Sequence, residues 1–341
     1  MIYNEPVEGV DLKTNYKVVI YGYPLYSHTH SFIHYGWYKA FKSLGFDTYW
    51  FHDKNFPTEF DFRNCIFISE GYADKDIPIE PTSIYFIHIC INPTKYIEKG
   101  ARLIDLRHSV RFLQDFSYDY EMNTQALQRL DNLIYYEENA SDIALRDKYR
   151  KNVHGYEAIY IIWATDMLPN EIDFSSAYLP RERNIYMIGS VWSANRIEIG
   201  EFQDECVKND INLVIKNFWK DKAVSNEDSK RYIQKSFIAP DIRGSGPISD
   251  ECVLERSNHL STGYIPCRVF KNISYGQLGI TNSWAVNDLF EGRIVFNGDI
   301  RKMFNEALQR KEDYKFIQEQ MEFVKKEHTY VNRVKSILSI L

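Results

Sequence analysis

Apolar positions in the N-terminal half of the chain follow two different spacings. The run 17–23 (KVVIYGY) is nearly continuous, which is typical of a buried strand, whereas the apolar and aromatic residues of 32–44 recur every three or four positions. The second segment stops before Gly45, and glycine favours the left-handed backbone that ends many helices. The pattern therefore predicts a strand, a loop and a helix. Further strands are predicted at 46–51, 65–69 and 84–91.

A second series of short apolar runs follows later in the chain, with helical patterns between several of them. From about Asn305 to the end, the composition is helical and lacks glycine and proline. Near-continuous apolar strands with connections of a dozen or more residues indicate parallel sheets covered on both faces. The predicted fold class is α/β. The second series of strands is predicted at 158–163, 184–189, 212–215, 235–239, 278–281 and 293–296.

The length of the chain favours two domains, because 341 residues exceed the usual size of one small domain. The stretch 168–183 contains two prolines and mixed charge, as expected of a connection, and we place the domain boundary there. Ligands of open α/β sheets bind outside the carboxyl ends of the strands. Two facing α/β domains are therefore expected to hold a ligand in a cleft at those ends.

Composition narrows the class of protein. The apolar fraction of 44% is ample for a core, and no window approaches the roughly 18–20 unbroken apolar residues of a membrane span. The N-terminal residues include acidic side chains and no apolar core of a signal peptide. The five cysteines are odd in number and widely spaced, which argues against a disulfide framework and a structural zinc site. We expect a cytoplasmic protein.

The net charge of −6 is spread over the chain without long runs, which gives no general attraction for a polyanion. Nucleic acid is therefore not an expected partner.

The stretch 263–283 (GYIPCRVFKNISYGQLGITNS) places cations and glycines close together. Its apolar residues have helical spacing, and Gly276 is suited to end the helix. The start of a helix presents free N–H groups to an anion, and Arg268 or Lys271 can add charge-assisted hydrogen bonds. A plainer interpretation is an amphipathic helix with two solvated cations and a glycine cap. The pattern alone does not separate the two.

Four segments resemble, in the same order, the donor-binding half of GT-B glycosyltransferases, especially the CgeB-like group. They are NIYMIGSVW, PCRVFKNISYGQLGITNS, LFEGRIVFNGDIRKMFNEAL and EHTYVNRVKSIL, and together they span about 184–340. The resemblance implies two Rossmann-like domains, at 1–175 for an acceptor and at 176–320 for a nucleotide-sugar. It also implies that a final helix, 321–341, packs back toward the first domain.

The resemblance assigns the segment around Arg268 to the diphosphate and ribose of the donor. Many members have a glutamate for the ribose hydroxyls after the phenylalanine of this helix, and here that position is Lys271. Lys271 is therefore expected to contact phosphate, and Asn272 or Asn282 to take hydroxyls. The predicted donor-binding residues are Arg243, Thr262, Gly263, Tyr264, Arg268, Lys271, Asn272, Gly276, Thr281 and Asn282.

The segment 26–34 (YSHTHSFIH) follows the first predicted strand. His28 or His30 is predicted to act as a base or to orient an acceptor hydroxyl, because imidazole titrates near neutral pH. Thr29 or Ser31 is expected to cap the following helix. The alternative is that a histidine only hydrogen-bonds the loop. The H-x-H spacing also fits a metal, but no further ligands follow at a recognisable spacing, so none is expected.

Several other polar residues follow predicted strands. Asp166 and Glu171 are candidates for a carboxylate near a sugar, although such residues more often cap a helix. Arg107 and His108 are further candidates for the cleft, and a structural role is again the more common alternative. Arg243 lies on a glycine-containing loop at 241–251 that is expected to be mobile. The late residues are expected to lie on the final helix and to fix the angle between domains, namely His328, Thr329, Tyr330 and Arg333.

The sequence therefore predicts a metal-independent glycosyltransferase that uses a nucleotide-sugar and needs no cofactor. Its catalytic candidates are His28, His30 and Asp166. Basic side chains and helix N-termini can stabilise a leaving diphosphate in place of a cation. The alternative is a catalytically silent binding module for a sugar-nucleotide or glycan, which the departure at Lys271 favours. A third hypothesis is a DNA-modifying sugar transferase, which needs a basic groove.

Overall fold

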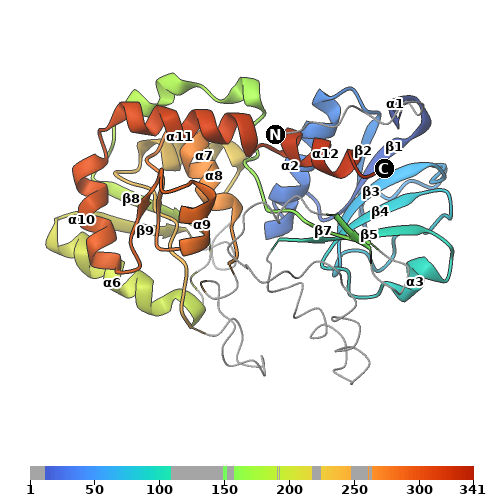
Figure 1. Ribbon diagram of the computed structural model, residues 1–341, viewed down its shortest axis with the longest axis horizontal. Helices are drawn as coiled ribbons and strands as arrows, with labels where there is room; N and C mark the ends of the chain where they lie inside the picture. The colour runs from blue at the N-terminus through green and yellow to red at the C-terminus, as the bar shows by residue number, and fades with distance from the viewer. Residues whose placement is uncertain are drawn as a thin grey trace. The chain divides into compact units, whose positions relative to one another are not determined.

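The computed structural model describes residues 12–108, 149–151, 157–189, 191, 193–216, 224–246, 260 and 263–341. The chain divides into two compact units (Figure 1). Unit 1 comprises Met1–Ile162 together with Tyr330–Leu341, and unit 2 is Trp163–Thr329. The sequence predicts boundaries between residues 175 and 176 and between residues 320 and 321, whereas the two units divide between 162 and 163 and between 329 and 330.

In the described part of unit 1, seven strands form one sheet in the order β2-β1-β3-β4-β5-β7-β6. The pairs are parallel except that β6 runs antiparallel to β7. Strands β3 and β4 are buried along their whole length, because both faces of a parallel sheet are covered. The strands are β1 (Lys17–Gly22), β2 (Thr48–His52), β3 (Cys65–Glu70), β4 (Ile84–His88), β5 (Arg102–Arg107), β6 (Tyr149–Lys151) and β7 (Glu157–Tyr160).

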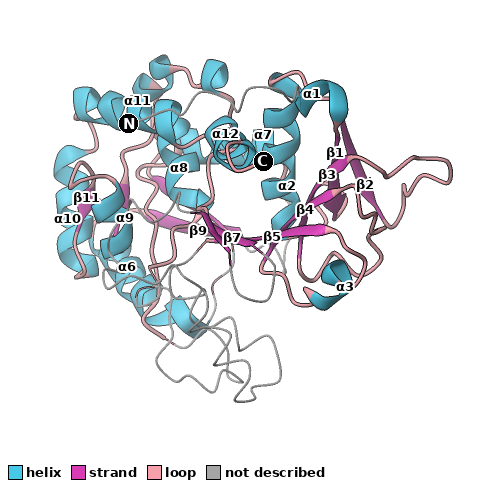
Figure 2. Cartoon of the chain, turned by 45° about the vertical axis from the view of Figure 1, so that its right-hand side comes forward, coloured by secondary structure: helices cyan, strands magenta, loops and turns pink. Residues whose placement is uncertain are grey.

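The helices of unit 1 include α1 (Leu12–Asn15), α2 (Thr29–Ser43), α3 (Thr94–Ile97) and α12 (Tyr330–Leu338). Figures 1 and 2 show α2 and α12 together on one side of the strands and α3 on the other. Tyr330 of α12 packs on α2, where its ring centroid lies 5.3 Å from that of Trp37. A C-terminal helix therefore returns to the first unit, as the predicted fold requires.

Unit 2 contains two pairs of parallel strands, β8 (Asn184–Ile188) with β9 (Asn212–Lys216) and β10 (Ile280–Thr281) with β11 (Val295–Phe296). The segment after Lys235 joins the two pairs. Its Phe237 N–H donates to the carbonyl of Asn184 at 2.7 Å, and its Asp241 N–H donates to the carbonyl of Ile280 at 2.8 Å. The pairs and this segment therefore form one layer, with the carboxyl ends of β8 and β10 at the same edge.

The strand predicted at 235–239 does not form. Lys235 is the last residue of a helix, and Pro240 has no N–H with which to pair. The predicted connection 168–183 instead forms two 3₁₀ helices within unit 2, and Lys325 of α11 lies 4.9 Å from the ring of Phe174. Pro169 of this stretch therefore begins a 3₁₀ turn.

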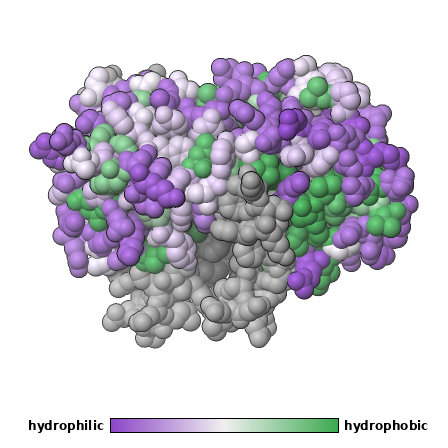
Figure 3. All heavy atoms as spheres, turned by 180° about the vertical axis from the view of Figure 1, so that it is seen from behind, coloured by the Kyte–Doolittle hydropathy of each residue, from purple (hydrophilic) through white to green (hydrophobic). Residues whose placement is uncertain are grey.

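The helices of unit 2 surround this layer of strands. The prediction of helices from about Asn305 to the end of the chain is confirmed. Figure 3 shows hydrophilic residues over much of the described surface visible there, as expected for helices with one apolar face. No helix within the described ranges is long and apolar enough to cross a membrane. The helices are η3 (Pro169–Glu171), η4 (Phe174–Tyr178), η5 (Ser193–Asn195), α6 (Arg196–Lys208), α7 (Asn226–Lys235), α8 (Cys267–Ser274), α9 (Trp284–Leu289), α10 (Ile300–Arg310) and α11 (Tyr314–Glu327).

The late residues do not share one helix, so that expectation was wrong. His328 ends α11 and is buried in unit 2, where its ring stacks on Phe270 at 4.7 Å. Thr329 follows, and α12 begins at Tyr330. Arg333 is buried in unit 1 and donates from Nε to the carbonyl of Ile162 at 2.8 Å.

The predicted α/β class is confirmed by these elements.

Candidate functional site

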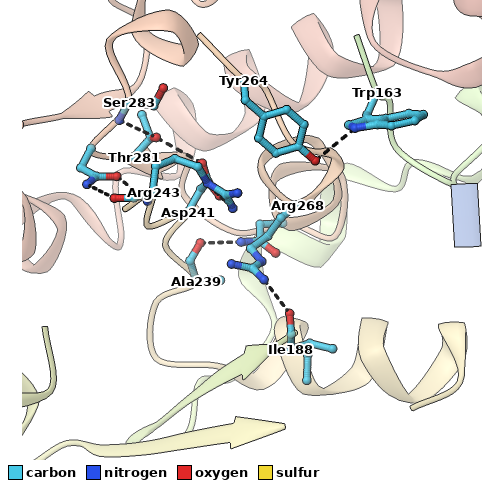
Figure 4. Close-up of polar contacts among 11 residues, drawn as sticks. Trp163, Ile188, Ala239, Asp241, Arg243, Tyr264, Arg268, Thr281 and Ser283 are labelled. Carbon is cyan, nitrogen blue, oxygen red and sulfur yellow. Dashed lines mark hydrogen bonds and ion pairs between the residues drawn. The ribbon is translucent and has the colours of Figure 1, made fainter. Parts of the chain in front are cut away.

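Arg268 lies at the carboxyl end of β8 in unit 2 (Figure 4). Its guanidinium donates to the carbonyl of Ile188, the last residue of the strand, at 3.1 Å. Gly189 follows with a φ of 133°, and a Cβ at this position would lie 2.3 Å from the same guanidinium. The positive φ therefore favours glycine, and the Arg268 guanidinium would have to shift to admit another side chain. Within the described part of the chain, Arg268 has no carboxylate partner within salt-bridge distance.

A second guanidinium lies nearby, at the end of the segment that joins the two strand pairs. Arg243 donates from Nε to Asp241 Oδ1 at 2.9 Å, and both residues are buried. Burial lowers the pKa of Arg268, and the charge of the neighbouring Arg243 lowers it further (Figure 4). Arginine keeps its charge under such shifts. This edge of unit 2 therefore concentrates positive charge that the Asp241 carboxylate balances only in part.

Tyr264 precedes α8 and faces the same edge (Figure 4). Its hydroxyl accepts a hydrogen bond from Trp163 Nε1 at 3.1 Å, and its ring centroid lies 5.8 Å from the Arg243 guanidinium. Burial raises the pKa of Tyr264 to about 12, so the phenol stays neutral. Gly263 adopts a φ of 65°, a left-handed conformation that suits glycine, and Thr262 lies outside the described residues.

Asp166 lies beside α8 and contacts two of its residues. Lys271 Nζ is 3.5 Å from Asp166 Oδ2, and the Tyr275 hydroxyl donates to Asp166 Oδ1 at 2.8 Å. Thr165 and Ser274 are joined by a hydrogen bond of 2.7 Å between their hydroxyls. The first residues of unit 2 therefore lie along α8. They place the Asp166 carboxylate next to Lys271.

Four other residues predicted to bind the nucleotide-sugar make contacts within unit 2 near Arg243 and Arg268. The Asn272 amide donates to the carbonyl of Ala239 at 2.7 Å. The Asn282 amide accepts from the Arg243 N–H at 2.7 Å and donates to the Arg243 carbonyl at 2.8 Å. Thr281 Oγ1 donates to Asp241 at 3.4 Å, and Gly276 packs on Ser176 with a φ of 93°. Contact of these residues with a ligand stays a prediction.

The histidine segment of unit 1 follows β1, at the carboxyl edge of its sheet. His28 is the N-cap of α2, and its Nδ1 accepts a hydrogen bond from the His30 N–H at 3.2 Å. The expectation that Thr29 or Ser31 caps this helix is wrong, because the helix begins at Thr29 and the Ser31 hydroxyl bonds within the loop. The ring of His28 also stacks on Tyr23, with 4.0 Å between centroids.

Glu70, the last residue of β3, meets this segment and was missed by sequence reasoning. The Tyr23 hydroxyl donates to Glu70 Oε1 at 2.5 Å, and His30 Nδ1 lies 3.9 Å from Glu70 Oε2. Burial raises the pKa of Glu70 and lowers the pKa of His28. Burial lowers the pKa of His30 to about 4. The available signal was an acidic residue at the carboxyl end of an otherwise apolar strand.

Other candidates have structural partners. The Glu171 side chain accepts from the Leu168 N–H at 2.7 Å, which matches a capping role. Arg107 is the last residue of β5 and donates to Asp105 at 2.7 Å within the core, and His108 follows it as a buried residue. Among the described residues, no group of three or more His, Cys, Asp or Glu is arranged to hold a metal ion.

No protein-family model matches the sequence, and no curated protein matches it. The described fold is similar to that of an alpha-glucosyltransferase solved with UDP and a 13-mer DNA containing an HMU base. The identity is 8%, the TM-score is 0.50, and the match covers 96% of this chain and 99% of that chain. A complex of an alpha-glucosyltransferase with UDP and a mismatched 13-mer DNA gives the same values. The chain has the GT-B fold. Membership of the CgeB-like group stays a prediction.

The expectation that nucleic acid plays no part was wrong. Two solved structures with this fold are complexes with DNA, so the fold accommodates a nucleic acid. The expectation rested on net charge, which averages over the chain and does not describe a local surface.

Proposed function

We propose that the protein is a glycosyltransferase that moves a sugar from a nucleotide-sugar to an acceptor hydroxyl. Unit 2 binds the donor and unit 1 serves the acceptor. The observation that carries this proposal is Arg268, held by a strand-end carbonyl beside Gly189, with Arg243 nearby. Two guanidinium groups at the carboxyl edge of an α/β sheet match the charge and the fork geometry of a diphosphate.

The same groups support transfer without a metal ion. A leaving nucleoside diphosphate gains negative charge as the bond to the sugar breaks, and preorganised cations at that position stabilise it. Arg268 is the principal cation in this proposal, because the charge of Arg243 is already paired with Asp241. Turnover that persists in EDTA supports this feature, and restoration by a divalent cation contradicts it.

Asp166 takes the hydroxyl-binding role that the family resemblance gives to a glutamate at the position of Lys271. The carboxylate lies 3.5 Å from Lys271 and is oriented by the Tyr275 hydroxyl. Carboxylate oxygens have several acceptor sites, so Asp166 can keep both contacts and accept a sugar or ribose hydroxyl. Lys271 then contributes a charge beside the donor.

DNA containing an HMU base is the first acceptor to test, because an alpha-glucosyltransferase of similar fold was solved with such a DNA. A glycan or a small hydroxyl compound is the alternative acceptor.

The second candidate function is a sugar-nucleotide binding module without transfer. The observation that favours it is Lys271, which faces Asp166 where the resemblance expects a glutamate. Such a module binds a nucleotide without releasing diphosphate from its sugar.

Thermal shift with UDP, GDP, CMP, TDP and their common sugars tests donor binding. A ligand at about 100 times its Kd adds roughly 2.7 kcal/mol of stability. We expect a selective rise in Tm with one nucleotide, and its loss in Arg268→Gln. Arg231→Gln is the matched control, because Arg231 is an exposed arginine of unit 2 paired with Asp228. No rise with any nucleotide, or an equal rise in Arg268→Gln, contradicts the proposed donor site.

A further inference from the structure

The side of unit 1 where α2 lies beside the edge strand β2 carries aromatic and basic residues together. Tyr35, Tyr38, Lys39 and Lys42 recur at three- and four-residue intervals along α2, so they lie on one side of the helix. The ring centroid of Trp50 in β2 lies 6.2 Å from that of Tyr35 and 5.7 Å from that of Tyr38. We call these residues, Tyr35, Tyr38, Lys39, Lys42 and Trp50, the aromatic–lysine face.

The opposite side of α2 packs on the sheet and is buried, as Trp37 and Phe41 show. In the aromatic–lysine face, by contrast, Lys42 is exposed and the other four residues are partly exposed. A helix with one buried side normally carries charged and polar residues on its other side. Here tyrosines accompany the lysines, so rings that the core of unit 1 does not use reach the surface.

The lysines of the face lie against its tyrosines. Lys39 Nζ lies 5.4 Å from the ring centroid of Tyr35. Lys42 Nζ lies 5.1 Å from the ring centroid of Tyr38 and donates to its hydroxyl at 3.1 Å. Within the described residues Lys42 has no carboxylate partner. Its positive charge is therefore presented beside an aromatic ring.

No acidic residue of α2 or β2 offsets these lysines. Neither element contains Asp or Glu. Asp47, which precedes β2, accepts a hydrogen bond from the Tyr49 hydroxyl at 2.9 Å, and Tyr49 points to the other face of the sheet because it alternates with Trp50. Asp53 lies beyond the end of β2, 3.7 Å from His52. The local charge of the face is therefore positive, although the net charge of the chain is −6.

We propose that the aromatic–lysine face binds a single-stranded segment of nucleic acid. Proteins that bind single strands without sequence preference combine cations that contact phosphates with aromatic rings on which unpaired bases stack. A polyanion complements the charge of this face, whereas an uncharged glycan gains nothing from the lysines. The face lies entirely within unit 1, and binding to it needs no sugar transfer. The inference therefore goes beyond the proposed function and does not depend on it.

This chemistry predicts two properties of the binding. A single strand binds more tightly than a duplex, because the bases of a duplex are already stacked on one another and cannot stack on the rings. The logarithm of the binding constant also falls with the logarithm of salt concentration, by about 0.7 for each phosphate that is neutralised on a single strand. For Lys39 and Lys42 together, the expected slope is about 1.4.

The first test is fluorescence anisotropy of the full chain with a labelled oligothymidylate of about 12 nucleotides. We expect binding at low salt, a fall in affinity as salt is added, and weaker binding of a duplex of the same length. Equal binding of the duplex and the single strand, or no binding of the single strand, overturns the inference.

The second test assigns the binding to the face. Trp50→Thr, which keeps a residue suited to a strand, and Tyr38→Ala are each expected to raise the Kd for the oligothymidylate by about 5- to 150-fold. Lys42→Gln is expected to lower the salt slope by about 0.7. Because Lys42 is exposed, this variant keeps the test valid if Trp50→Thr does not fold. Wild-type Kd and salt slope in Tyr38→Ala and Lys42→Gln, at unchanged Tm, overturn the inference.

Lys325→Gln is the matched control, because Lys325 Nζ also lies over a ring, 4.9 Å from the centroid of Phe174, but belongs to unit 2. We expect it to bind the oligothymidylate as the wild type does. An effect equal to that of Lys42→Gln indicates general electrostatic attraction and overturns the assignment to the face. Binding of vesicles that contain phosphatidylserine, weakened in Lys42→Gln and without binding of the oligothymidylate, assigns the face to a membrane and also overturns it.

Discussion

The two units present different chemistry at the same structural position, the carboxyl edge of a parallel sheet. In unit 1 this edge carries histidines and Glu70, whose pKa values are shifted by burial toward the neutral forms. In unit 2 it carries Arg268 and Arg243, which keep their charge and are held by a backbone carbonyl and by Asp241. Parallel sheets thus supply the same position in both units, and the loops and helices that follow the strands bring different side chains to it.

The largest expected effect distinguishes Arg243 from Arg268. Arg243→Gln leaves Asp241 buried without its cation, and breaking a buried ion pair costs about 3–5 kcal/mol. The free energy of unfolding of this variant, measured by urea titration, is expected to fall by that amount. A stability equal to that of the wild type contradicts the assignment of the Arg243 charge to Asp241.

Arg268→Gln is expected to have the complementary effect on function. Arg268 has no carboxylate partner among the described residues, so its loss leaves no buried charge unpaired. Removing one donor to a developing anion lowers turnover by about 10²–10³, which corresponds to about 2.7–4 kcal/mol. Steady-state kinetics at unchanged Tm check this prediction, and a loss of stability without a loss of turnover contradicts it.

The next effect is the acid sensitivity of unit 1. His34 is buried in α2, neither ring nitrogen has a hydrogen-bond partner in the described structure, and burial lowers its pKa to about 3. In the unfolded chain the His34 imidazole takes up a second proton below about pH 6.5, whereas in the folded chain it stays neutral down to about pH 3. The free energy of unfolding therefore falls as the pH drops from about 6.5 toward 3. The slope is at most about 1.4 kcal/mol per pH unit for one such group.

His34→Leu is the variant that checks this origin. The free energy of unfolding, measured by urea titration between pH 7 and 4.5, is expected to depend less on pH in His34→Leu than in the wild type. An unchanged slope assigns the acid sensitivity to other groups, of which His30 and His88 are the nearest candidates because burial also lowers their pKa values.

The smallest effects compare two helical glycines, one in each unit. A Cβ on Gly36 of α2 would lie 2.2 Å from the Tyr330 ring of α12, whereas a Cβ on Gly200 of α6 meets nothing within 4 Å. Gly36→Ala is expected to lower the free energy of unfolding by about 1–3 kcal/mol through overpacking. Gly200→Ala is expected to raise it by about 0.5–1 kcal/mol through helix propensity. Equal effects contradict the packing of α12 on α2.

The sequence predicts the strands and the main helices of both units because apolar periodicity records burial directly. It fails at 235–239, where the apolar run continues after Lys235 and the helix end cannot be seen. It also places a domain connection at 168–183, because a proline such as Pro169, which begins a 3₁₀ helix, resembles the proline of a linker.

The contacts within the candidate sites also could not be predicted from the sequence. Arg268 can be proposed from its position in a motif, but its pairing with a strand-end carbonyl depends on Gly189, which is distant in sequence. One hydrogen bond makes His28 the N-cap of α2, and the pairing of β1 with β3 brings Glu70 to the histidine segment. Side-chain geometry of this kind is a product of the fold, so spacing along the chain does not encode it.

Release of nucleoside diphosphate from a panel of sugar-nucleotides, by the wild type and by Arg268→Gln, tests the central claim most directly. The assay is run with a DNA duplex containing an HMU base and with simple hydroxyl compounds as acceptors. We predict release from one donor by the wild type, and a loss of at least about 10² in Arg268→Gln at unchanged Tm. No release by the wild type from any donor, or equal release by the two proteins, would contradict glycosyl transfer at the sheet edge of unit 2 that carries Arg268 and Arg243.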